Sequence, residues 1–427
     1  MRAVDAGPDG EGATRKDGLA ADDEPAARHR RLRWWALPIL VTVAFLVLQP
    51  LLGSGWALFP DSYRYAKQAE KILGASPGDA HMTALNAFCE SRADQAFRAD
   101  TWVPIDSSPA ERAQSVTACL DKYGPAGDLT TLDPRYQSIF TTRPGYPLLL
   151  APFVAAWGVI DGMRILGFAL AAAGGLVAYA VLRLARLSAF AAGAGQVVYL
   201  VSPLGWWALQ GLGEGLGDLC VLGAVAGVVL ALRGRTGAGI AVTAASWLAL
   251  GFVRFSSLLL ISAAMAAACV ALGLWAARAR QRAMFTLAGV CAGATGLTML
   301  AMPVLGLPGA AVTLQDTFTN HFADPLVPDP WRRLAAANVH FWPAWLATPS
   351  ASWAVVACAL IGAAALVRWR RDLLWPALAL FAAGAAQVAA HPLPQEAERL
   401  GLLMWIPATF GTAVLVHVAT RLFQQRV

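Results

Sequence analysis

Residues 28–52 read RHRRLRWWALPILVTVAFLVLQPLL, a cluster of basic side chains followed directly by an apolar run. The run has about the length that an α-helix needs to cross the hydrocarbon core of a bilayer. A signal peptide has a similar apolar core, but here the preceding polar region is long and no clear Ala-x-Ala cleavage site follows. We therefore expect a retained first transmembrane helix at 34–52.

The composition of the whole chain agrees with a lipid environment. Of its 427 residues, 57% are hydrophobic and 14% are charged, whereas soluble domains carry roughly 25% charged residues. The net charge of +6 does not indicate nucleic-acid binding, because the arginines lie in short clusters between apolar runs. The sequence predicts an all-α membrane protein whose partner is the lipid bilayer, with no nucleic acid.

Apolar runs of helix-spanning length recur along the chain and predict about ten transmembrane helices. After the first helix they lie at 163–182, 188–207, 215–232, 237–253, 255–276, 283–306, 350–367, 373–390 and 400–418. Residues 1–33 lack apolar periodicity and predict a disordered cytoplasmic tail. The remaining boundaries separate an outer loop at 53–162, helices two to seven at 163–306, a second outer loop at 307–349, and helices eight to ten with a short tail at 350–427.

The distribution of charge orients these helices. With the N-terminal tail in the cytoplasm, the inner connections hold twelve basic residues against one acid, and the outer connections after residue 143 hold eight acids against five bases. Because cytoplasmic loops are enriched in Lys and Arg, we expect both termini in the cytoplasm and the large loop outside the plasma membrane. The division between 237–253 and 255–276 rests on Arg254 alone, and one long helix there would invert every later loop.

The cysteines and histidines say little about metals. Four of the six cysteines fall in apolar runs, where they pack as small hydrophobes, and Cys89 and Cys119 alone lie in polar sequence. These two would form a disulfide if the loop faces an oxidising compartment, although the sequence does not show how far apart they lie. No CxxC, HExxH or paired-His spacing supports a protein-built zinc site.

Two motifs stand near the two ends of the large loop. PDSYRYAKQAEKILG at 60–74 has apolar residues at helical spacing, which predicts an interfacial amphipathic helix at about 61–73. Asp61 falls at the cap position of that helix, so capping is its simplest interpretation. TTRPGYPLLLAPF at 141–153 begins a second apolar segment, 146–160, which should lie along the outer interface because a crossing there would invert the charge pattern.

Together these motifs resemble the GT-C membrane glycosyltransferases, which use polyprenyl-phosphate-linked sugars. The resemblance begins with an Asp-x-x-x-Tyr-Ala-x-x-Ala helix after the first crossing, followed by Arg-Pro-x-Tyr-Pro-Leu-Leu before the second. Downstream, Glu214, Arg254 and the Glu396 to Arg399 stretch are similar to acidic and Arg-bearing segments of the family. The resemblance covers roughly 34–260 well and the remainder loosely, and it rests on the order and placement of short motifs.

The resemblance implies a mechanism for these residues. Asp61 would be the general base that removes the proton of an acceptor hydroxyl during an inverting hexosyl or pentosyl transfer. Guanidinium groups would bind the donor phosphate, and these are Arg143, Arg254 and Arg399. Substrate binding would further involve Arg64, Tyr65, Tyr146, Glu214 and Glu398. The acceptor would be a glycan, lipid or protein, and no cofactor is implied beyond a divalent cation that the substrate could bring.

Alternatives remain open at this point. Leu400 replaces the Tyr of the family's Glu-x-Arg-Tyr stretch, and the second acid that many relatives carry beside Asp61 is absent, so an inactive scaffold is one alternative. Arg254 at a helix end could merely reach toward lipid headgroups, and Glu214 could be a solvated acid at a helix start. A transporter or flippase is another alternative, which would normally show repeated halves and charges near mid-membrane.

Overall fold

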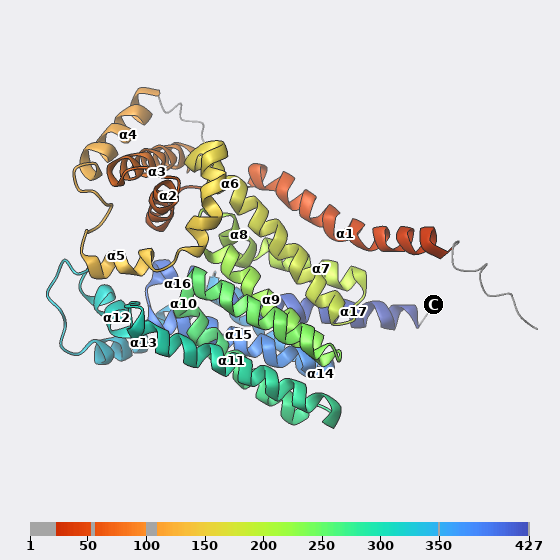
Figure 1. Ribbon diagram of the computed structural model, residues 1–427. Helices are drawn as coiled ribbons and strands as arrows, with labels where there is room; N and C mark the ends of the chain where they lie inside the picture. The colour runs from red at the N-terminus through yellow and green to blue at the C-terminus, as the bar shows by residue number, and fades with distance from the viewer. Residues whose placement is uncertain (1–22, 53–55, 100–108, 349–350, 426–427) are drawn as a thin grey trace, which may run out of the picture.

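The computed structural model describes residues 23–52, 56–99, 109–348 and 351–425, and over these ranges the predicted all-α fold is confirmed, with no β-strand. A helix bundle carries further helices at one end (Figure 1). The bundle comprises α1 (Asp23–Leu52), α6 (Gly145–Leu184), α7 (Ala189–Val201), α8 (Pro203–Leu209), α9 (Glu214–Leu232), α10 (Thr236–Trp275), α11 (Arg278–Val304), α14 (Ala351–Trp369), α15 (Arg371–Ala390), the 3-10 helix η1 (Leu402–Trp405) and α17 (Ile406–Gln424). The end of the bundle is covered by α2 (Pro60–Ile72), α3 (Pro77–Ala99), α4 (Pro109–Tyr123), α5 (Pro134–Thr141), α12 (Ala310–Phe318), α13 (Pro330–Ala347) and α16 (Pro394–Leu400).

Proline marks where many of these helices begin. It occupies the first position of α2, α5, α8, α13 and α16. Proline suits that position because its missing N–H would have no partner inside the helix and its φ is already helical. The short helices at the end of the bundle are thus started by local sequence.

Seven helices in the described ranges are long and apolar enough to cross a membrane, which indicates a multi-pass membrane protein. They are α6, α9, α10, α11, α14 from Ser352, α15, and η1 with α17. Two shorter apolar helical segments, Trp35–Gln49 and Ala189–Val201, coincide with two of the predicted crossings. The total of ten crossings stays a prediction.

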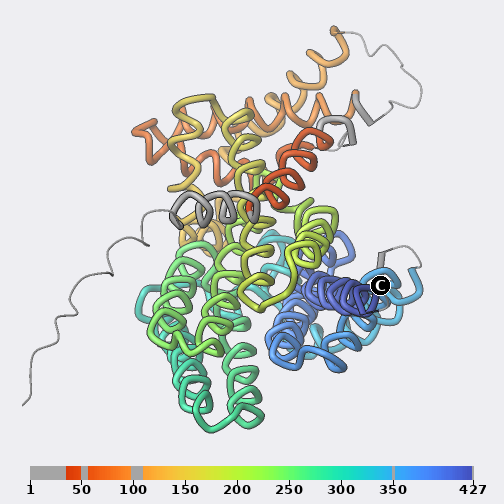
Figure 2. The backbone as a smooth tube through the Cα atoms, turned by 90° about the vertical axis from the view of Figure 1, so that its right-hand side faces the viewer, coloured from red at the N-terminus to blue at the C-terminus, as the bar shows by residue number. Residues whose placement is uncertain are grey.

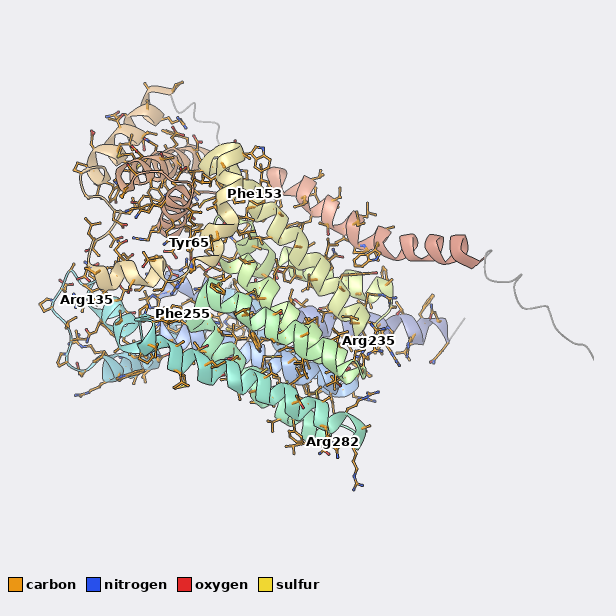
Figure 3. All side chains as sticks on the ribbon, in the orientation of Figure 1. Tyr65, Arg135, Phe153, Arg235, Phe255 and Arg282 are labelled. Atoms are coloured by element: carbon orange, nitrogen blue, oxygen red, sulfur yellow. A yellow bond between two sulfur atoms is a disulfide. The ribbon has the colours of Figure 1, made fainter. Side chains whose placement is uncertain are left out.

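The α10 helix is 40 residues long but is interrupted at Arg254, whose φ of −156° and ψ of 81° are not helical. Trp247, before the interruption, donates a hydrogen bond to Cys291 of α11 at 3.4 Å, and Cys269, after it, lies next to the same Cys291 side chain. A straight helix would separate two residues 22 positions apart by about 33 Å. The chain therefore reverses at Arg254, and Figure 3 shows Phe255 at the opposite end of the bundle from Arg235 and Arg282. The predicted division of this region at Arg254 agrees with that geometry.

Two predicted boundaries need correction. The run at 188–207 is not one helix, because α7 ends at Val201 and Pro203 begins α8, so the chain breaks at Ser202. The segment predicted at 146–160 joins the following crossing in α6, with a break at Gly158, whose φ is +74°. Glycine adopts this left-handed conformation without the clash that a Cβ would cause. Interfacial placement of that segment stays a prediction.

The helices α2 to α5 form a cap, defined here as residues 60–99 and 109–141, at one end of the bundle (Figure 1). Figure 2 views the bundle from its other end, and there α2 to α4 lie at the top. Within it α2 is packed against both α3 and α6, so that Tyr63, Arg64 and Tyr65 are all nearly inaccessible to solvent. The helix predicted at about 61–73 is present as α2, and its interfacial placement stays a prediction. The structure joins Cys89 of α3 to Cys119 of α4 in a disulfide, with Cα atoms 5.8 Å apart.

Candidate functional site

Asp61 and Arg399 meet where the cap rests on the bundle, although 338 positions separate them in sequence. Asp61 does not cap α2: the cap is Phe59, whose N–H donates to the Ser62 hydroxyl at 3.1 Å. The Asp61 carboxylate instead accepts a hydrogen bond from Nη1 of Arg399 at 2.7 Å. The capping interpretation of Asp61 is therefore wrong, and its side chain belongs to an interaction between the cap and α16.

Arg399 is the centre of a group of charges. Its Nη2 lies 2.6 Å from Glu396 on the preceding turn of α16, and its Nε lies 3.6 Å from Glu214 at the start of α9. Glu214 in turn accepts a hydrogen bond at 2.9 Å from Arg254, at the reversal point of α10. Four separated segments of the chain thus converge on one cluster of alternating charges.

Arg143 completes the cluster in a different way. It lies in the connection between α5 and α6, and its guanidinium group interacts with the Tyr65 side chain. No carboxylate oxygen in the described residues lies within 4.0 Å of its nitrogens, and its Nε has no hydrogen-bond partner there. Arg143 is therefore a partly buried cation whose Nε has no partner in the described residues.

The start of α6 places Arg143 beside Arg254. A Cβ added at Gly145 would lie 2.9 Å from the backbone carbonyl carbon of Phe252, closer than side-chain carbons approach backbone atoms. Only glycine permits this contact between α6 and α10. The Pro-Gly-Tyr-Pro run after Arg143 therefore has a packing role as well as a positional one.

A cavity of about 250 Å³ opens onto this cluster and is lined by Asp61, Arg143, Arg254, Glu396 and Arg399. It lies at the end of the bundle where Figure 3 labels Tyr65 and Phe255. Further polar side chains on its wall are Tyr136, Ser257, Asp316, His321, Gln387 and His391. Three carboxylates, of Asp61, Asp316 and Glu396, and three guanidinium groups line this common space, which can hold an anion next to a proton acceptor.

Electrostatics keep the Asp61 carboxyl ionised. Burial alone would raise its pKa, but the positive charges of Arg399 and Arg64, with the hydrogen bond from Arg399, outweigh burial and hold the pKa below its ordinary value of 3.8. The same acids act on Arg399: burial lowers the pKa of its guanidinium, and Asp61, Glu214 and Glu396 raise it further than burial lowers it. Both partners are therefore charged at neutral pH.

Arg64 does not line the cavity, although the sequence suggested a substrate-binding role. Its guanidinium donates to Asp128 at 3.1 Å and to Thr130 at 2.9 Å, and it lies over the rings of Tyr136 and Phe140. The Arg64 and Asp128 side chains are only 3% and 1% exposed. Arg64 therefore stabilises the cap, and its Nη1 lies 3.7 Å from Oδ1 of Asp61.

Replacing Arg64 by Gln is expected to lower the free energy of unfolding by about 3 kcal/mol, because Asp128 would remain as a buried charge without its main cation. Thermal unfolding of the purified protein in detergent would measure the change. Arg135→Gln is the matched control, since Arg135 pairs with Asp133 at the surface and its side chain is 45% exposed. Equal shifts for the two variants would contradict the role given to Arg64.

The other predicted substrate-binding residues separate into two groups. Tyr65, Tyr146 and Glu214 belong to the cluster: the two rings pack with centroids 5.0 Å apart, and Glu214 bridges Arg254 and Arg399. Glu398 does not belong to it. It lines a separate, mainly apolar cavity of about 680 Å³ on the other side of α16, together with His340, Phe341, Trp345, Met404 and Trp405.

Sequence reasoning chose Glu398 where the structure favours Glu396. The signal for Glu396 was its spacing of three residues from Arg399, which places both side chains on one face of a helix. The wall formed by Ser257 and Gln387, whose side chains hydrogen-bond at 3.0 Å, had no signal in the sequence because both lie in apolar runs. Within the described residues, no group of three or more His, Cys, Asp or Glu side chains is arranged to hold a metal ion.

Comparison with known proteins adds no relative. No family model, no curated protein and no solved structure matches this chain. The function is therefore inferred from the geometry and chemistry of the site itself.

Proposed function

We propose that this protein is an integral membrane glycosyltransferase that moves a sugar from a polyprenyl-phosphate donor to a hydroxyl acceptor. The observation that carries the proposal is the 250 Å³ cavity, which is lined by the Asp61 carboxylate and by the guanidinium groups of Arg143, Arg254 and Arg399. A base and a set of phosphate-binding cations are the two groups that such a transfer requires. The resemblance of the motifs to GT-C enzymes supports the same function.

The reaction follows from these groups. The acceptor oxygen attacks the anomeric carbon while the bond from that carbon to the phosphate oxygen breaks, so the configuration inverts. The acceptor proton passes to Asp61, and the electron pair of the broken bond leaves on the polyprenyl phosphate. Arg143, which has no carboxylate partner in the described part of the chain, stabilises the negative charge that develops on the leaving phosphate.

The ion pair between Asp61 and Arg399 gives the donor a second role. While Arg399 holds the Asp61 carboxylate at 2.7 Å, the carboxylate is a weak base. A phosphate that takes hydrogen bonds from Arg399 would loosen this pair and raise the basicity of Asp61. Donor binding would then activate the base only when a leaving group is present.

The apolar cavity suggests where the prenyl chain lies. Pro394, Ala397, Glu398 and Gly401 line this 680 Å³ space, whereas Glu396, Arg399 and Leu400 line the charged cavity. The two cavities therefore adjoin opposite sides of one short helix, α16. A donor whose phosphate lies in the charged cavity could place apolar units in the other.

We further propose ten membrane crossings in the plasma membrane, with both termini cytoplasmic and the cap outside. The reversal at Arg254 supplies a crossing on each side of that residue, and the Arg-rich connections lie at the end of the bundle away from the cap. The disulfide between Cys89 and Cys119 supports an oxidising compartment for the cap.

One observation favours a transporter or flippase instead. Asp218, one turn into α9 from Glu214, is buried, and its Oδ2 has no partner in the described residues. An ionisable group of this kind inside a bundle often marks a transport path. The space that reaches Asp218 measures only about 30 Å³, however, which is too small for a sugar. We therefore rank transfer above transport.

The direct experiment uses the purified full-length protein in liposomes with a panel of radiolabelled polyprenyl-phosphate sugars and outer-envelope extracts as acceptors. We expect one donor to yield labelled product and free polyprenyl phosphate. Movement of the donor across the bilayer without product would instead indicate a flippase. Neither product nor movement with any donor would leave the inactive scaffold as the better interpretation.

A further inference from the structure

A second charged cavity lies at the end of the bundle opposite Asp61. Its volume is about 510 Å³, and five arginines and one carboxylate line it. The charged residues are Arg186, Arg233, Arg280, Arg370, Arg421 and Asp372. Figure 3 labels Arg235 and Arg282, close neighbours of two of them in sequence, at the end of the bundle far from Tyr65 and Phe255.

The five arginines reach this cavity from five separate segments. Two follow α6 and α9, one belongs to the first turn of α11, one precedes α15, and one is on α17. Enrichment of arginine in cytoplasmic connections explains their presence at this end of the bundle. It does not explain why five segments direct arginines to one cavity, since a spread around the rim would satisfy the same rule.

Two of these arginines are held in place by the protein. Arg233 donates a hydrogen bond to the carbonyl of Leu184, at the end of α6. Arg370 donates to the carbonyl of Ala185 at 2.7 Å and makes a two-pronged pair with Asp372 at 2.8 and 2.6 Å. The one acid of the cavity is thus already neutralised by Arg370.

Three arginines are left uncommitted. The guanidinium groups of Arg186, Arg280 and Arg421 make no hydrogen bond or ion pair within the part of the chain that the structure describes, and all three side chains are exposed. Together with Arg233, they give four arginines that lack a carboxylate partner there. Like charges gathered in this way repel each other, so the arrangement is favourable mainly when an anion is bound.

The rest of the lining adds a donor and an apolar wall. The backbone N–H of Ser188 donates to Nδ1 of His417 at 3.1 Å, so a neutral His417 carries its proton on Nε2, which can donate to a ligand. The apolar side chains of Trp369, Val414, Val418 and Leu422 line the same cavity, and Trp369 and Leu422 are 42% and 54% exposed. Arginines beside exposed apolar side chains match a phosphate at the edge of a membrane.

We propose that this cavity is a binding site for a phosphate ester, carried either by an anionic membrane lipid or by a soluble compound. Guanidinium groups bind phosphate oxygens through paired, charge-assisted hydrogen bonds. Basic pockets between helices at the cytoplasmic side of a membrane are suited to anionic headgroups. The site is independent of the charged cavity at Asp61 and of the glycosyl transfer proposed there.

The test is native mass spectrometry of the full-length protein in detergent, titrated with phosphatidylglycerol, phosphatidylcholine or sn-glycerol 3-phosphate. We expect phosphatidylglycerol to be retained much more strongly than phosphatidylcholine. The double variant Arg280→Gln with Arg421→Gln should bind the anionic lipid about 30-fold more weakly, given the usual contribution of each arginine near an anionic surface. The corresponding double Lys variant should keep most of the binding.

The matched control is Arg235→Gln with Arg278→Gln, which removes the same charge from the same end of the bundle at residues that do not line the cavity. We expect almost unchanged binding in this control. If sn-glycerol 3-phosphate competes with the lipid, the ligand is a soluble phosphate ester. If it does not compete, the ligand is a lipid. Both results support a phosphate site. Equal losses in the two Gln double variants, or equal retention of both lipids by the unaltered protein, would overturn it.

Discussion

Replacing Asp61 by Asn is expected to lower the rate of sugar transfer by about 10²- to 10⁴-fold, the usual contribution of a general base. The amide has nearly the same shape and can still accept a hydrogen bond from Arg399 through its oxygen. It cannot take the proton of the acceptor hydroxyl. Initial rates in liposomes, with donor binding measured in parallel, would show a fall in turnover at nearly unchanged donor affinity.

Asp161→Asn is the matched control for this measurement. Asp161 is also an acid next to an arginine, at 3.5 Å from Arg164, but its side chain is 66% exposed and it does not line the cavity. It should retain full activity. Full activity of Asp61→Asn, with the protein folded and the donor bound, would remove Asp61 from the mechanism and favour the inactive scaffold or the flippase.

Replacing Arg399 by Met is expected to abolish transfer and to lower the free energy of unfolding by about 3–5 kcal/mol, because it leaves several acids without their shared cation. Asp61, Glu214 and Glu396 all lie within 4 Å of the Arg399 guanidinium. Methionine keeps much of the side-chain volume, so the loss reports charge more than packing. Thermal unfolding in detergent at pH 7.5 would measure it.

The stability of this variant should depend on pH in a defined direction. In the unaltered protein the pKa of Asp61 is lowered, so its pair contributes stability above the ordinary pKa of 3.8 and loses it as the pH falls through the folded value. Without Arg399, only Arg64 and Arg143 would oppose the effect of burial, so the pKa of Asp61 would rise from its value in the unaltered protein. The deficit of Arg399→Met should therefore be largest near neutral pH and shrink below about pH 4.

The exposed Arg333 supplies the control for Arg399. It pairs with Asp329 at 3.2 Å on α13, and its side chain is 51% exposed, so Arg333→Met should change stability little at any pH. A deficit of Arg399→Met that stays constant from neutral to acidic pH would contradict the proposed charge balance.

Much of the cluster was predictable from sequence because its members sit at helix boundaries on one side of the bundle. Counting crossings places Asp61, Arg143, Glu214, Arg254 and Arg399 at the same end, although they are spread over most of the chain. This placement depends on a chain reversal at Arg254. The charges of the later loops indicate that reversal, because a single long helix there would put their arginines on the outer side. The pairing of the charged side chains within the cluster could not be predicted from the sequence.

The errors have local physical causes. Arg64 follows Asp61 on the same helix, and the sequence does not show that α5 and the segment before it enclose Arg64, because cap packing depends on contacts between distant segments. Glu396 and Glu398 lie on a helix of seven residues, too short for a periodic pattern to show which face meets Arg399. The run at 188–207 was predicted as one helix from its length, although Pro203 inside it starts a new helix, α8.

The single-residue reversal in α10 restricts how this protein can change. Arg254 both connects two antiparallel helical segments and donates to Glu214, so the connection has no spare length. An inserted residue there would rotate the guanidinium away from its partner, whereas at Gly234, in the turn after α9, an added Cβ would have no neighbour within 4 Å. Length variation among related sequences, or the insertion of a reporter domain, should therefore be tolerated at the turn after α9 and excluded at Arg254.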